Sequence, residues 1–169
     1  QLALRYLAQG ANVSPQEIVI TSGAMEGLSL CLQAVTRPGD LIAIESPTFY
    51  AGLQASERLG LKVIEIPSHP REGVNLSALE DALRHHPIKA CLFMLNFANP
   101  TGSRVSDENK KALLGLLRRH DIPLIEDDVY AELYFGIQAP LCSKVDDQSG
   151  LVMHVSSFSK SLAPGYRIG

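Results

Sequence analysis

The chain has 169 residues, of which 46% are hydrophobic and 20% charged, and its formal net charge is −3. These values are typical of a globular protein with one sizeable core, and the net charge gives this segment no bulk electrostatic attraction for nucleic acid. No stretch approaches the roughly 20 apolar residues of a membrane span. The three cysteines are odd in number and two lie in apolar runs, which indicates reduced core thiols and a cytoplasmic protein.

Strands and helices alternate along the chain. The hydrophobic pattern predicts strands near residues 18–21, 41–45, 62–66, 90–95, 122–126 and 151–156. It predicts helices near residues 1–9, 24–36, 50–59, 76–86 and 106–120. This alternation predicts an α/β fold, a three-layer α/β/α domain with a mostly parallel, doubly wound sheet. Such sheets bind ligands at the carboxyl ends of their strands, so polar residues that follow strands are the first candidates for a site.

The first candidate is the segment 21–28, which follows a short apolar strand and contains Gly23. A strand, a glycine turn and a helix present free backbone N–H groups and the positive end of the helix dipole to an anion. A helix capped by Ser22 is the alternative interpretation, and the two are compatible.

Three more motifs follow later strands. Residues 45–50 read Glu-Ser-Pro-Thr-Phe-Tyr, and residues 96–102 read Asn-Phe-Ala-Asn-Pro-Thr-Gly. A core aromatic and a simple turn are the alternatives for these two. Residues 122–130 read Ile-Pro-Leu-Ile-Glu-Asp-Asp-Val-Tyr. Three acids in a row can bind a metal, but no suitably spaced histidine or carboxylate accompanies them, so no metal site is predicted.

The most informative residue is Lys160. It ends the motif Ser157-Phe158-Ser159-Lys160 after an apolar run, and Arg167 lies seven residues further on. A lysine at the mouth of a buried strand can be desolvated, which lowers its pKa and frees a nucleophilic amine. Nearby hydroxyls and a guanidinium suit a phosphate. An aldehyde-binding lysine beside a phosphate site describes pyridoxal 5'-phosphate (PLP), although Ser-x-Ser-Lys alone is common.

The joint order of these motifs resembles the fold-type I PLP enzymes, the class I/II aminotransferase family, from about Ile18 to Arg167. The resemblance implies that Lys160 binds PLP covalently and that Asp127 pairs with the pyridine nitrogen. Tyr130 and Asn99 would bind the phenolic oxygen. Phe49 would stack on the ring, although many relatives carry tyrosine there and Tyr50 leaves this assignment open.

The phosphate would be held by the amides of Ala24 and Met25 with Ser157 and Arg167. The expected catalytic residues are therefore Lys160, Asp127 and Tyr130. The expected cofactor-binding set is Ala24, Met25, Phe49, Asn99, Asp127, Tyr130, Ser157, Lys160 and Arg167.

Two functions remain open. Residues 67–73, 96–100 and 125–130 are most similar to the MocR branch of GntR-type transcription regulators, in which a winged helix-turn-helix is fused to a PLP-binding, aminotransferase-like domain. The alternative is a free-standing aminotransferase that transfers an amino group between an amino acid and a 2-oxo acid.

The chain begins inside a predicted helix and ends where Arg167 would enter a strand. We therefore expect residues 1–169 to be the large domain of a longer protein, without its upstream and C-terminal small domains. The expected partners are an amino acid or amine as substrate or effector, DNA only through a domain outside this chain, and a second copy in a homodimer.

Overall fold

A computed structural model describes all 169 residues, and its centre is a six-stranded sheet in the order β3-β2-β1-β4-β5-β6. All pairs are parallel except β2 with β3. The strands are β1 (Leu41–Ser46), β2 (Lys62–His69), β3 (Gly73–Val74), β4 (Ile88–Phe93), β5 (Leu124–Asp127) and β6 (Val152–Val155). The predicted α/β fold with a mostly parallel sheet is confirmed.

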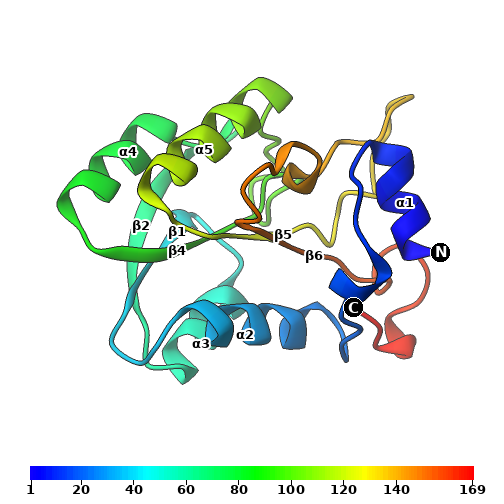
Figure 1. Ribbon diagram of the computed structural model, residues 1–169, viewed down its shortest axis with the longest axis horizontal. Helices are drawn as coiled ribbons and strands as arrows, with labels where there is room; N and C mark the ends of the chain where they lie inside the picture. Colours follow the sequence, from blue (N-terminus) through cyan, green and yellow to red (C-terminus); the bar gives the residue numbers. More distant parts are fainter.

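Helices cover both faces of the sheet (Figure 1). The helices are α1 (Leu2–Gln9), α2 (Ala24–Val35), α3 (Tyr50–Arg58), α4 (Leu76–His85) and α5 (Asp107–His120). Helices α2 and α3 lie on one face, α4 and α5 lie on the other, and α1 stands beside the β6 edge (Figure 1). Short 3₁₀ turns are η1 (Pro15–Glu17), η2 (Ser143–Asp146) and η3 (Pro164–Tyr166). None of these helices combines the length and apolar character that a membrane crossing requires.

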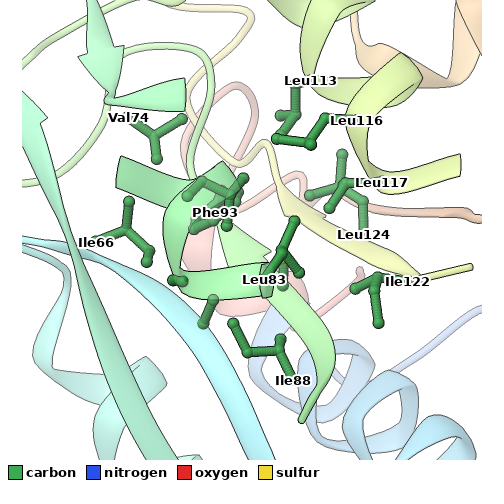
Figure 2. Packing of buried hydrophobic residues seen from close by; sticks show 14 of the residues in the cluster. Ile66, Val74, Leu83, Ile88, Phe93, Leu113, Leu116, Leu117, Ile122 and Leu124 are labelled. Carbon is green, nitrogen blue, oxygen red and sulfur yellow. The ribbon is translucent and has the colours of Figure 1, made fainter. Parts of the chain in front are cut away.

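The core consists of two apolar layers. Seventeen buried residues form the larger one, and Phe93 lies among the side chains of the sheet and of α4 and α5 (Figure 2). The helices that close this layer start at side-chain caps: Asn75 accepts a hydrogen bond from Ala78 N, and Ser106 accepts one from Asn109 N. The second layer has nine buried residues, including Leu28 and Leu32 of α2. The layers pack on either face of the sheet, and because β1, β2, β4, β5 and β6 are parallel, their carboxyl ends lie at one edge.

Two segments differ from the expectation. Residues 18–21 form no strand, because only Thr21 pairs with a distant segment, exchanging hydrogen bonds of 2.8 and 3.0 Å with Gly169, while the amide of Ile18 donates to the nearby Pro15 O. Val19 and Ile20 are 71% and 61% exposed. Apolar sequence alone does not make a strand without a neighbour to pair with. The short antiparallel strand β3 was not predicted, since two residues are too few to show the alternation of apolar and polar residues that marks a strand.

Candidate cofactor site

Asp127 is the best-defined polar group at the carboxyl edge of the sheet. It is the last residue of β5, pairs in register with Val155 of β6, and is 5% exposed. Burial raises the pKa of its carboxyl to about 6, against the effect of a hydrogen bond from the Val129 amide. Its Oδ1 has no hydrogen-bond partner in the protein. A buried carboxylate oxygen without a donor is costly, so this atom is suited to a cationic N–H from a bound group.

Glu45 is a second buried acid at this edge, at the end of β1, and is 3% exposed. The amide of Met94 donates to both of its carboxylate oxygens at 3.0 and 3.2 Å. Burial raises the pKa of Glu45 to about 8, and the charge of Asp127 acts in the same direction. Glu45 was not among the predicted site residues, although an acid directly after the apolar run 41–44 is a recognisable signal.

The start of α2 has the geometry expected of an anion cradle. Gly23 is the N-cap, with φ of 89°, and offers no side chain to the helix, so the first-turn amides of Ala24 and Met25 have no carbonyl acceptor within α2. The Ser22 cap considered from the sequence is not formed. Arg167 lies directly over this turn: its Nη2 is 3.4 Å from Ser22 O, and its Cζ is 3.1 Å from where a Gly23 Cβ would stand.

The segment around Ser157 closes this cradle. Ser157 Oγ donates to Ile168 O at 3.2 Å and accepts from the amide of Ser159 at 3.0 Å. Arg167 Nη1 is 3.4 Å from Ser159 Oγ. The predicted phosphate residues Ala24, Met25, Ser157 and Arg167 are therefore brought to one place by contacts between the start of α2 and the end of the chain.

Lys160 lies next to Tyr130, with its Nζ 5.8 Å from the centre of the phenol ring. The amine and the phenol are the two groups expected at the reactive side of the cofactor. However, Lys160 is exposed, so the burial expected for it from the sequence is not provided by the surrounding residues. Lys160 therefore lies near Tyr130, but its side chain is exposed to solvent.

Phe49 and Asn99 are half-buried on the loops that follow β1 and β4. Phe49 is the N-cap of α3 and lies edge-on to Tyr50, with 4.8 Å between ring centres. Tyr50 is 65% exposed, which favours Phe49 as the ring-stacking residue. The Asn99 side chain makes no hydrogen bond within the protein and is free to donate to a ligand.

A chain of buried polar groups runs behind Asp127. Lys110 Nζ donates to Asn96 Oδ1 at 2.7 Å, Asn96 Nδ2 donates to Asp128 Oδ1 at 3.0 Å, and His154 Nε2 is 2.9 Å from Asp128 Oδ2. His154 Nδ1 is 2.6 Å from the hydroxyl of Tyr6. The carboxylate of Asp128 is thus used within the fold, whereas Asp127, the other aspartate of the pair, keeps one oxygen free. Sequence reasoning missed this network, because its members are far apart in the chain.

Comparison with known proteins shows the family of the chain. The family model for aminotransferase class I and II matches residues 1–169. The chain belongs to this family. Its match to the uncharacterized HTH-type transcriptional regulator YdcR of Escherichia coli K12 is 52% identical over 168 residues and covers 99% of the chain. Its match to aromatic-amino-acid aminotransferase 1 of Thermococcus litoralis is 34% identical and covers 93% of it.

The chain spans 36% and 39% of the length of those two proteins. Among solved structures, the kynurenine aminotransferase of Pyrococcus horikoshii, in a complex with PMP, superposes with a TM-score of 0.89 at 33% identity. The superposition covers 98% of this chain and 42% of that protein. The aminotransferase fold expected from the sequence is confirmed.

Proposed function

We propose that this chain is the PLP-binding domain of a MocR-type transcription regulator, and that it senses an amino acid or a related amine. The observation that carries the PLP assignment is the unpartnered, buried Oδ1 of Asp127 at the carboxyl end of β5. The 52% identity to an HTH-type regulator over 99% of the chain favours a regulator. DNA binding would then come from a domain outside these 169 residues, and the full-length protein would be a cytoplasmic homodimer.

Each part of the site fits one part of PLP. The amides of Ala24 and Met25 and the guanidinium of Arg167 supply donors to a phosphate, and the Ser157 hydroxyl lies beside them. Phe49 offers a ring to stack on, and Asn99 and Tyr130 would donate to a phenolic oxygen. These residues would bind and orient the cofactor.

The chemistry belongs to Asp127 and Lys160. PLP, when bound, supplies an aldehyde for amines and an electron sink for the bonds next to them. Asp127 would hold a proton on the ring nitrogen, since a buried carboxylate favours a charged N–H partner. Lys160 would bind the aldehyde, yield it to an incoming amine, and then move a proton to and from the amine's carbon. Tyr130, beside Lys160, would orient that amine.

A free-standing aminotransferase is the second candidate, because the 34% identity to an aromatic-amino-acid aminotransferase also covers most of the chain. The two differ in output. A regulator would bind the DNA upstream of its target gene with an affinity that the effector changes. An enzyme would turn over amino acids without any DNA binding.

The test is covalent trapping in the full-length protein. With PLP added, the protein should absorb visible light, and borohydride should fix the cofactor to Lys160, which peptide mass mapping would identify. Lys160→Ala should retain PLP only through phosphate and stacking contacts and give no adduct. An adduct on Lys62 or Lys89 in place of Lys160 would show that the assignment is wrong.

A further inference from the structure

Helix α1 contacts the residues next to Tyr130 and Lys160 directly, and it reaches the residue next to Asp127 through His154. We propose that Arg5 and Tyr6 of α1 are positioning residues, which hold the segments bearing Asp127, Tyr130 and Lys160 in place for the cofactor. This inference rests on the proposed PLP binding. The contacts of Arg5 and Tyr6 that support it do not depend on a bound cofactor.

Arg5 bridges two of these segments with one side chain. Its Nη1 is 2.6 Å from Glu132 Oε1, and its Cζ is 5.4 Å from the centre of the Phe158 ring. Glu132 lies two residues after Tyr130, and Phe158 lies two residues before Lys160. A planar guanidinium can pair with a carboxylate and lie over a ring at the same time. Arg5 therefore links the loops that carry the phenol and the amine.

Tyr6 reaches the third segment through a histidine. Its hydroxyl is 2.6 Å from His154 Nδ1, and its ring meets the imidazole edge-on at 5.5 Å. His154 Nε2 is 2.9 Å from Asp128, whose amide donates to Val155 O at 2.8 Å. The chain from Tyr6 to Asp128 thus anchors the backbone on which Asp127 stands.

The Tyr6–His154 contact holds in either protonation state of the imidazole. A neutral ring accepts the tyrosine hydroxyl at Nδ1 and donates from Nε2, and a charged ring donates from both nitrogens. Burial lowers the pKa of His154, but the hydrogen bond and charge of Asp128 outweigh it and raise that pKa overall. The link between α1 and β6 is therefore independent of the proton on His154.

These polar contacts matter because α1 has little else to hold it. The helix has eight residues, none of them buried, and it stands beside the β6 edge (Figure 1). A helix this short is marginal without tertiary contacts. Besides Arg5 and Tyr6, Gln9 accepts a hydrogen bond of 3.6 Å from Cys142 Sγ. Ordering of α1 and ordering of the loops that carry Tyr130 and Lys160 therefore stabilise each other.

The experiment compares Arg5→Ala and Tyr6→Phe with the wild type in the full-length protein. Tyr6→Phe removes only the hydroxyl, and Arg5→Lys retains a charge for Glu132 without the planar group over Phe158. The matched control is Arg84→Ala, since Arg84 is also an exposed helix arginine, paired with Glu80 at 2.9 Å, but lies on α4 away from the site. Two readouts are used: the dissociation constant of PLP from visible absorption, and amide hydrogen exchange of residues 128–134 and 156–163 without PLP.

We expect Arg5→Ala and Tyr6→Phe each to weaken PLP binding about fivefold and to speed exchange in these two segments, as loss of one exposed or half-buried polar contact would. Arg84→Ala should do neither. Unchanged PLP affinity and unchanged exchange in both α1 variants would overturn the inference. A wild type that binds no PLP would instead refute the proposed function, and the exchange measurement would still decide whether α1 positions these loops.

Discussion

The guanidinium of Arg167 lies over the backbone of Gly23, so near that a Cβ on this glycine would stand 3.1 Å from Arg167 Cζ and nearer still to Nη2. Gly23 also has a φ of 89°, which residues with a side chain rarely adopt. The first turn of α2 and the last residues of the chain meet at this point. The proposed anion cradle therefore depends on the absence of a side chain at residue 23, which lets the guanidinium lie against the turn.

Gly23→Ala should weaken phosphate and PLP binding, because the methyl group pushes the Arg167 guanidinium aside and strains a backbone of positive φ. The matched control is Gly39→Ala, since Gly39 has a φ of 94° but nothing within 4 Å of its Cβ position. Both variants should lose about 1 kcal/mol of stability from the backbone alone. Equal PLP affinity in the two variants, measured by absorption titration, would contradict the assignment of the cradle.

Asp127→Asn should leave the fold and covalent PLP attachment intact, since its Oδ1 bonds to no other group in the protein. The loss of the negative partner lowers the pKa of the ring nitrogen, so any transamination should fall by orders of magnitude. The control is Asp128→Asn, which disturbs bonds to Asn96 and His154 and should cost about 1–3 kcal/mol of stability. If only Asp128→Asn alters the cofactor absorption, the site residue is Asp128 and not Asp127.

Glu45→Gln should change how stability depends on pH. The pKa of Glu45 is about 8 in the fold, against an ordinary 4.5, so the folded protein holds a proton that the unfolded chain releases between these values. The stability from this proton is fully present below pH 4.5 and is lost as the pH rises to 8. Glutamine cannot ionise and still accepts from the Met94 amide.

Relative to the wild type, Glu45→Gln should therefore gain free energy of unfolding as the pH rises, by about 1.4 kcal/mol for each pKa unit of the shift. Urea unfolding between pH 4.5 and 8.5 measures this. Glu57→Gln, at an exposed position on α3, is the control and should change the slope much less. A difference in unfolding free energy between Glu45→Gln and the wild type that stays the same at every pH would show that Glu45 is ionised in the fold.

Lys110→Met should be strongly destabilising. The ammonium is buried, donates to Asn96 Oδ1 and Leu141 O, and lies near the charges of Glu126 and Asp128. Removal of it leaves these acceptors unpaired, at an expected cost of about 3 kcal/mol. Lys111→Met is the neighbouring control, since Lys111 is exposed and only 3.8 Å from Asp146, and it should cost less than about 1 kcal/mol. Similar melting temperatures for the two variants would contradict the importance of the network.

The sequence by itself determined the alternation of elements and the places where polar motifs follow strands. Apolar runs such as that before Asp127 and caps such as Asn75 are local signals, so the strands and helices were predictable within a few residues. The order of the motifs identified the family before any contact was known. These features depend on residues that are neighbours in the chain.

Tertiary structure decided the rest. Residues 18–21 are apolar but form no strand, since a strand also needs a partner that local sequence does not name. Of two adjacent acids, the fold uses Asp128 for Asn96 and His154 and leaves an oxygen of Asp127 free. Lys160 is placed beside Tyr130 but remains exposed. The burial, the hydrogen-bond partners and the pKa of a side chain are set by groups distant in sequence. Only the folded chain therefore determines which carboxylate keeps a free oxygen and whether a lysine is buried or exposed.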